Sequence, residues 1–203
     1  MTRLAALVLP LLVLAGCSAT PGQPAAEATP VPFAACGELT QPPTDAASSA
    51  PAGASAPAGV PAGAALPDLN LPCVAGGPPV ALRDVRGPAV INLWASWCGP
   101  CRSELPAFQR LADRYGGQVH VVGVNTRDGP EAAVSLATDL GLTLPTLADP
   151  DERLRVAVRR AALPVTVFVD RSGRVRHIHD STALDDEALA ALVRRHLDVP
   201  VTA

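Results

Sequence analysis

The chain of 203 residues contains no lysine, one methionine and one tyrosine, and aromatic residues make up only 3% of it. Its 16 cationic side chains are all arginine, they form no basic block, and the formal net charge is −3. The sequence therefore gives no reason to expect a nucleic-acid-binding surface. It also lacks an apolar run of the roughly 20 residues that a membrane-spanning helix needs.

An apolar run at the N-terminus covers only residues 4–14. Arg3 precedes it and the sequence LAGC, which ends at Cys17, closes it, an order that is typical of an export signal. The segment resembles the bacterial lipobox, in which this cysteine is acylated. We therefore expect residues 1–16 to be a lipoprotein signal peptide and Cys17 to be the lipid anchor, on the outer face of a bacterial cytoplasmic membrane. An ordinary secretory signal with a chance cysteine is the alternative.

Residues 17–66 consist mostly of alanine, proline, glycine, serine and threonine, and contain little that a core could bury. This composition predicts a flexible to semi-extended tether that leads to a folded domain at residues 67–199. One island interrupts the tether: VPFAACGELT, with Phe33, Cys36 and Leu39. The remaining length suits one hydrophobic core, so we expect a single domain.

The folded part alternates between short apolar stretches, typical of buried strands, and stretches with apolar residues at helical spacing. Strands are predicted at residues 89–94, 118–125, 144–149, 165–169 and 175–178. Helices are predicted at residues 101–115, 129–140, 151–158 and 185–197. The order β-α-β-α-β-α-β-β-α predicts an α/β layer architecture with a mixed central sheet flanked by helices.

The motif WCGPC, at residues 97–101, places two cysteines three positions apart between a predicted strand and a predicted helix. At the start of a helix, the thiolate of Cys98 faces unpaired N–H groups and the positive end of the helix dipole. We therefore expect the pKa of this thiol to lie below its usual value of about 8.5. Cys101, one turn later, is expected to resolve the mixed disulfide that forms when Cys98 attacks a substrate disulfide. Trp97 is expected to pack beside the thiols and shield them.

Two other interpretations of the cysteine pair stay open. The pair could contribute to a metal site together with His177 and His179, which alternate along one predicted strand. No second cysteine pair lies at zinc-finger spacing, however, and histidines of an edge hairpin are more often surface residues. The pair could also be a purely structural disulfide.

The stretch NLWASWCGPCRSELP, at residues 92–106, resembles the active-site segment of the thioredoxin superfamily. More narrowly, it resembles that of the extracytoplasmic TlpA/ResA-like thiol-disulfide oxidoreductases. The resemblance covers about residues 68–198 and implies a thioredoxin-like fold. The stretch LPVTVFVD, which begins at Leu163, resembles the cis-proline loop of this family. The resemblance implies that Pro164 lies against the disulfide, where a backbone edge could pair with an extended substrate segment beside Cys98. Trp97, Leu163 and Pro164 are therefore the expected substrate-binding residues.

Two positions distinguish the chain from ordinary thioredoxins. Asn92 stands where thioredoxins carry a buried aspartate. Glu104 matches the acid of the ELP motif in TlpA/ResA-like members, and the resemblance implies that it exchanges a proton with Cys101. The alternative is an ordinary acid in the first turn of a helix, favoured by the dipole. Residues 125–149 resemble the βα insertion of this group.

The other cysteines leave one pair to explain. With Cys17 lipidated and Cys98 paired with Cys101, Cys36 and Cys73 remain. In an oxidising compartment a disulfide between them would persist, and it would hold the island of the tether to the domain. A second redox relay, which passes electrons to Cys98, is the alternative.

The resulting hypothesis is a membrane-tethered thiol-disulfide oxidoreductase that needs neither an organic cofactor nor a metal, because the dithiol is the redox group. The expected partners are disulfide-containing exported proteins and a membrane electron donor, and the chain is expected to be a monomer. The family resemblance implies apocytochrome c as a substrate. A thiol oxidase or isomerase of oxidative folding and a metal-binding chaperone are the alternatives. A peroxiredoxin is disfavoured, because the cysteines do not follow a Thr-x-x-Cys pattern.

Overall fold

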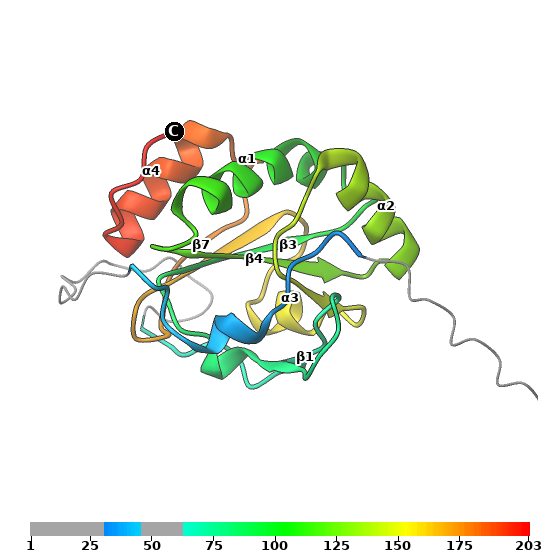
Figure 1. The fold of residues 1–203 in the computed structure, drawn as a ribbon, viewed down its shortest axis with the longest axis horizontal. Coiled ribbons are helices and arrows are strands. Elements are labelled where there is room, and N and C mark those ends of the chain that lie inside the picture. The colour runs from blue at the N-terminus through cyan, green and yellow to red at the C-terminus, as the bar shows by residue number, and fades with distance from the viewer. Residues whose placement is uncertain (1–30, 46–62) are drawn as a thin grey trace, which may run out of the picture. The chain divides into compact units, whose positions relative to one another are not determined.

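A five-stranded mixed sheet forms the centre of the computed structural model, which describes residues 31–45 and 63–203 (Figure 1). The expected signal peptide, Cys17 and most of the expected tether lie outside the described residues. The strand order is β5-β4-β3-β6-β7. These strands are β3 (Ala89–Trp94), β4 (His120–Thr126), β5 (Thr146–Asp149), β6 (Val165–Val169) and β7 (Val175–His179). Within the described ranges, no helix combines the length and the apolar character that crossing a membrane would take.

The central strand β3 is apolar at every position except Asn92, and its place in the sheet explains this composition. It pairs with β4 in parallel and with β6 antiparallel, and all six of its residues are buried. Successive side chains point to opposite faces of a strand, so Ile91 and Leu93 enter one core cluster, whereas Val90 and Trp94 enter clusters on the other face. A strand covered on both faces has a nearly continuous apolar sequence, and in AVINLW only Asn92 interrupts it.

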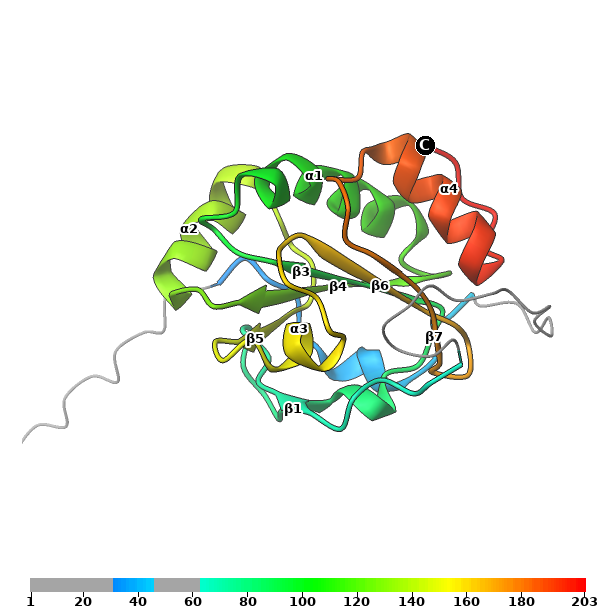
Figure 2. The ribbon, with the colours of Figure 1, turned by 180° about the vertical axis from the view of Figure 1, so that it is seen from behind.

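Helices cover one face of this sheet, and shorter elements cover the other (Figures 1 and 2). The first face carries α1 (Gly99–Tyr115), α2 (Pro130–Leu140) and α4 (Asp186–Leu197). The opposite face carries α3 (Arg153–Ala157), the hairpin of β1 (Asn70–Leu71) and β2 (Val80–Ala81), and the 3-10 turns η1 (Gly37–Thr40) and η2 (Leu82–Asp84). The predicted α/β fold and the order of elements from β3 to α4 are confirmed. The β1–β2 hairpin was not predicted.

The ends of the helices follow ordinary capping chemistry. α2 begins at Pro130 and ends before Gly141, whose φ of 65° is left-handed, as a C-terminal glycine allows. The side chain of Asp185 caps α4 by accepting a hydrogen bond from the N–H of Ala188. Gly116 follows α1 with a right-handed φ of −55°, so this glycine does not form the left-handed cap that such residues often provide.

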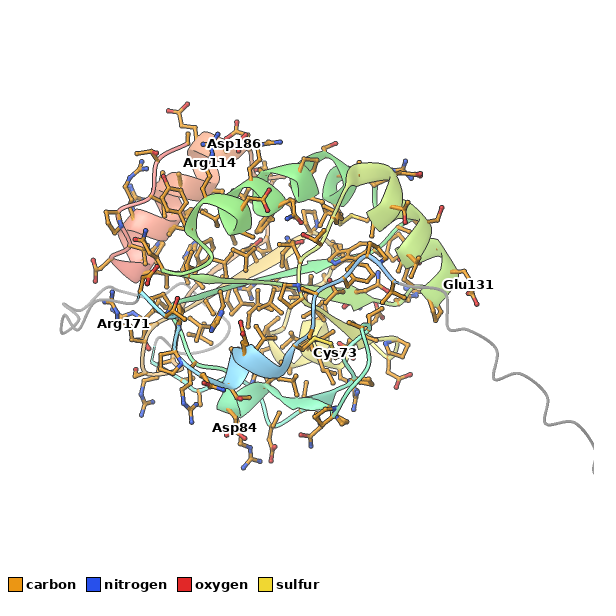
Figure 3. All side chains as sticks on the ribbon, viewed as in Figure 1. Cys73, Asp84, Arg114, Glu131, Arg171 and Asp186 are labelled. Carbon is orange, nitrogen blue, oxygen red and sulfur yellow. A yellow bond between two sulfur atoms is a disulfide. The ribbon has the colours of Figure 1, made fainter. Side chains whose placement is uncertain are left out.

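The stretch from residue 31 to residue 45 packs on the domain. Phe33, Cys36 and Leu39 are at most 5% exposed, and the N–H of Arg86 donates to the carbonyl oxygen of Leu39. Cys36 forms a disulfide with Cys73, and their Cα atoms are 5.9 Å apart. Figure 3 shows Cys73 on the side of the sheet opposite α1. The apolar island therefore lies against the core, although composition alone places it in a tether.

Residues 63–66 also belong to the folded part, ahead of the expected start at residue 67. The N–H of Gly63 donates to the carbonyl oxygen of Val175, and the N–H of Val175 donates to that of Ala64. Leu66 is only 3% exposed and joins the core. Backbone pairing with β7 orders a stretch whose small side chains gave no signal of a strand.

Candidate active site

The cysteine motif lies at the edge of the sheet where the parallel strands end. β3, β4 and β5 are parallel neighbours, so their carboxyl ends meet at one edge, and antiparallel β6 begins there. Open α/β sheets bind their ligands beyond this edge. The turn after β3 leads directly to Cys98, which is the N-terminal cap of α1.

Cys98 and Cys101 form a disulfide at the first turn of α1. Their Cα atoms are 5.3 Å apart, and the backbone N–H of Cys101 donates to Sγ of Cys98 over 3.2 Å. Cys98 is 5% exposed and Cys101 is fully buried. A thiolate at Cys98 would be stabilised by that N–H and by the helix dipole. Both residues are therefore buried in the disulfide form, and Cys101 is the less exposed of the two, as the motif predicted.

Trp97, which was expected to pack beside the thiols, is an exposed side chain. Its side chain is 59% exposed, one of two large apolar side chains that the described residues leave exposed. Its indole Nε1–H donates to the carbonyl oxygen of Arg127 over 2.8 Å. The buried tryptophan is Trp94, which is 1% exposed and lies with its ring centroid 6.4 Å from that of Phe33. Trp97 offers an apolar surface to solvent next to Cys98 in the sequence.

The carboxylate of Asp128 fixes the turn before Cys98. It accepts hydrogen bonds from the N–H and the hydroxyl of Ser96, over 2.6 and 2.7 Å. It also accepts from the amide of Asn125 and from the N–H of Gly129. This clasp joins the turn after β4 to the turn after β3. The sequence did not predict these hydrogen bonds, because a single aspartate 32 residues from its partner forms no recognisable sequence motif.

The peptide bond between Leu163 and Pro164 is cis. Pro164 directly precedes β6, in which Val165 is paired with Leu93 of β3. Leu163 packs against the cluster that contains Cys98 and is partly exposed. The structure therefore brings this loop to the same edge of the sheet as the disulfide.

Glu104 is a buried carboxyl group behind the disulfide. It follows Cys101 by three residues on α1, so both side chains lie on one face of the helix, and Glu104 is 1% exposed. Its Oε1 accepts from Nδ2 of Asn92 over 2.6 Å, and its Oε2 accepts from the N–H of Leu184 over 2.9 Å. Burial raises the pKa of Glu104 from 4.5 to about 7, and the hydrogen bonds from Leu184 and Asn92 oppose this rise.

Asn92 is the polar partner that completes this buried network. Its amide also donates to Oγ1 of Thr166 over 3.2 Å, while its own Oδ1 is buried without a hydrogen-bond partner. An amide turned by 180° would present that oxygen to a protonated Glu104 and to the Thr166 hydroxyl. Asn92 can therefore hydrogen-bond Glu104 whether that carboxyl group is ionised or protonated. Sequence reasoning did not find Asn92 and Leu184 as the hydrogen-bond partners of Glu104.

The candidate metal ligands His177 and His179 lie on β7, two strands away from β3. The ring of His177 stacks on that of His196, with centroids 4.2 Å apart, and His179 hydrogen-bonds the carbonyl oxygen of Thr182. Burial, followed by the charge of His177, lowers the pKa of His196 to about 4. In residues 31–45 and 63–203, no group of three or more His, Cys, Asp or Glu side chains could hold a metal ion. His177 is thus half-buried against α4, and not the surface residue that an edge hairpin suggested.

The fold, with a disulfide at a helix N-terminus beside a cis-proline loop, is that of the thioredoxin-like class, to which thiol-disulfide oxidoreductases belong. The sequence profile of the AhpC/TSA family matches residues 62–178, which is more than half of the chain. The chain belongs to this family.

Known relatives agree with that class. Over 119 residues the chain is 31% identical to the thiol-disulfide oxidoreductase ResA of Geobacillus kaustophilus, covering 58% of this chain and 66% of that protein. It is 33% identical over 112 residues to the thiol:disulfide interchange protein DsbE of Pseudomonas fluorescens, covering 54% and 61%. The matches thus span slightly less than two thirds of these two proteins. A thio-disulfide isomerase from Thermus thermophilus superposes with a TM-score of 0.53 at 29% identity, covering 69% of this chain and all of that one. The predicted resemblance to the ResA-like group is confirmed.

Proposed function

We propose that the chain reduces disulfides of exported proteins through Cys98 and Cys101. The thiolate of Cys98 attacks one sulfur of the substrate disulfide, forms a mixed disulfide and releases the other sulfur as a thiolate. The thiolate of Cys101 then attacks Sγ of Cys98, forms the intramolecular disulfide and releases the second substrate thiolate. Two electrons pass from the dithiol to the substrate. The observation that carries the proposal is the Cys98–Cys101 disulfide at the N-terminus of α1, with the buried Glu104 one helical turn after the less exposed Cys101.

Glu104 is proposed to take up the proton of Cys101 before the second step. A group whose pKa is about 7 can accept and release a proton near neutral pH. A carboxylate at its ordinary pKa would be a weaker base. The position of Glu104 on the buried face of α1, one turn from Cys101, supports transfer directly or through a water molecule.

Trp97, Leu163 and Pro164 are proposed to bind the substrate. Trp97 is the exposed apolar side chain next to Cys98, and the Leu163–Pro164 bond lies on the other side of the motif, at the start of β6. An extended substrate segment could pair with backbone groups there while Trp97 packs on its side chains. The Cys36–Cys73 disulfide is proposed to be structural, because it belongs to the core cluster on the opposite face of the sheet and joins residues 31–45 to the domain.

The compartment and the partners extend the proposal beyond the described residues. The lipobox-like sequence ending at Cys17 supports lipid attachment at the outer face of a bacterial membrane, after removal of residues 1–16. There the oxidised dithiol would need a membrane electron donor. The ResA-type and DsbE-type relatives, together with the motif resemblance, make the haem-binding cysteines of apocytochrome c the proposed substrate. The chain is proposed to act as a monomer.

Reduction of insulin disulfides, followed by turbidity in the presence of a thiol reductant, tests the proposal. Cys98→Ala should abolish the activity, because the attacking sulfur is lost. Cys101→Ala should accumulate a mixed disulfide between Cys98 and the substrate, visible by mass spectrometry. Full activity in both variants would overturn the proposal.

A thiol oxidase or isomerase is the second candidate, and the likeness to the Thermus thermophilus isomerase favours it. The chemistry at Cys98 is the same, but the electrons flow in the opposite direction or return to the substrate. The midpoint potential of Cys98–Cys101 separates the candidates. A value near that of thioredoxin, about −270 mV, supports the reductase, and a value near about −120 mV supports an oxidase.

A further inference from the structure

The turn after β4 holds an arginine in an unusual backbone conformation next to the candidate active site. Arg127 has a φ of 50°, in the left-handed region that residues other than glycine adopt infrequently. Its N–H donates to the carbonyl oxygen of Asp149, and its own carbonyl oxygen accepts the indole N–H of Trp97. Strained residues that their surroundings hold in place are enriched at functional sites. The left-handed backbone of Arg127 therefore suggests a function for its side chain.

The guanidinium of Arg127 carries a charge that its neighbours leave largely unneutralised. It lies 4.0 Å from a carboxylate oxygen of Glu152 and is 68% exposed. Glu152 is bound more closely by Arg155, at 2.9 Å, and both of those side chains are at most 21% exposed. The three side chains together carry a net charge of +1, and the exposed part of that charge is on Arg127.

Other acids near this turn do not cancel the charge. The carboxylate of Asp128 is directed at Ser96, Asn125 and its own turn, and accepts four hydrogen bonds there. Asp151 and Glu131 are exposed on neighbouring turns, but no ion pair found among the described residues joins either of them to Arg127.

We infer that Arg127 binds a carboxylate of the polypeptide substrate, so that the site favours disulfides flanked by acidic residues. The inference rests on the proposed function, which places a substrate disulfide over Cys98. The sheet order puts the turn of Arg127 on the β4 side of Cys98, and the Leu163–Pro164 loop on the β6 side. A segment that crosses Cys98 between these two loops passes Trp97 and then Arg127. A guanidinium pairs with a carboxylate through two parallel hydrogen bonds, which also orients the chain that carries it.

Two model peptides, each with one disulfide, test this inference. They share a sequence except for the residues that flank one cysteine, which are glutamate in the first and arginine in the second. Their rates of reduction are compared for the wild type, Arg127→Gln, Arg127→Glu and Arg127→Lys. Arg114→Gln is the matched control, because Arg114 is exposed near the other end of α1 (Figure 3).

The wild type and the Arg114→Gln control should reduce the acidic peptide about two- to fivefold faster, the range of exposed charge pairs, and added salt should weaken the preference. Arg127→Gln should remove the preference, Arg127→Glu should reverse it, and Arg127→Lys should keep most of it. Because the Trp97 bond uses the backbone of Arg127, all three variants keep the indole in place. An unchanged preference in Arg127→Gln, or equal rates for both peptides in the wild type, overturns the inference while leaving the proposed function intact. Reduction of neither peptide by the wild type overturns the proposed function itself.

Discussion

Replacing Glu104 by glutamine should stabilise the oxidised protein at neutral and alkaline pH. The pKa of Glu104 is about 7 in the folded protein, because the carboxyl group is desolvated, and 4.5 when it is solvated. At about 1.4 kcal/mol per pKa unit, this difference corresponds to about 3 kcal/mol. A raised pKa means that the folded state binds the proton more tightly than the unfolded state. The stabilisation from the protonated acid is therefore complete below pH 4.5 and is lost as the pH rises through 7.

Glutamine keeps the shape and the hydrogen bonds of a protonated Glu104 without the penalty of a buried charge. Its oxygen can accept from the N–H of Leu184, and its amide can donate to Oδ1 of Asn92 once that amide is turned. Urea unfolding at pH 4 and pH 8, with both disulfides closed, measures the difference between the two proteins. Between pH 4 and pH 8, we expect the free energy of unfolding of Glu104→Gln to rise by about 3 kcal/mol relative to that of the wild type.

Glu131 provides the control for this experiment. It is exposed on α2, as Figure 3 shows, so Glu131→Gln should have the same free energy of unfolding as the wild type at both pH values. If the free energy of unfolding of Glu104→Gln also changed with pH as that of the wild type does, burial would not destabilise the ionised carboxyl group in the folded protein. The proposed role of Glu104 as a base near neutral pH would then lose its physical support.

Three further predictions concern stability away from the disulfide of the active site. Replacing both Cys36 and Cys73 by serine should lower the free energy of unfolding, measured in urea, by about 3–4 kcal/mol, because these cysteines close a loop of 37 residues. Insulin reduction at 25 °C should be unchanged. A decrease in the free energy of unfolding of less than 1 kcal/mol would contradict a structural role. Phe33→Ala should lower the free energy of unfolding by about 3 kcal/mol. It should also shift the fluorescence of Trp94 to longer wavelength, because the ring that covers Trp94 is removed; unchanged emission would count against this packing. His196 has a lowered pKa, so the unfolded state binds its proton first, and stability should fall as the pH drops from 6.5 towards 4. His196→Phe should reduce that fall, and an identical acid profile would argue against the stacked histidines as its source.

The order of elements from β3 to α4 could be predicted because the apolar patterns there are strong and the turns are marked. Residues 165–169 alternate between two buried faces and are entirely apolar or β-branched, and Gly141 and Gly173 mark turns with positive φ. The β1–β2 hairpin could not be predicted in this way. Its strands are two residues each, too short for any periodicity to appear.

The cysteine pair of the candidate site could be predicted for a different reason, since the spacing of Cys98 and Cys101 is itself the chemical signal. The polar residues that lie around this pair carry no such signal. Glu104 meets Asn92 and Leu184 only after α1 has folded onto the sheet, across 12 and 80 residues of sequence. The clasp of Asp128 on Ser96 likewise depends on two parallel strands ending at the same edge. Sequence reveals such residues as polar positions, whereas tertiary structure decides what they bind.

The central claim is that Cys98 and Cys101 form the exchanging dithiol, while Cys36 and Cys73 do not take part. Peptide mapping by mass spectrometry tests it directly, after the protein with only the first pair reduced is mixed with one equivalent of a peptide disulfide. The account predicts that one equivalent of peptide is reduced, that a Cys98–Cys101 disulfide appears in the same amount, and that the Cys36–Cys73 disulfide stays closed throughout. Free thiols at Cys98 and Cys101 after prolonged incubation, or exchange through Cys36–Cys73 instead, would contradict it.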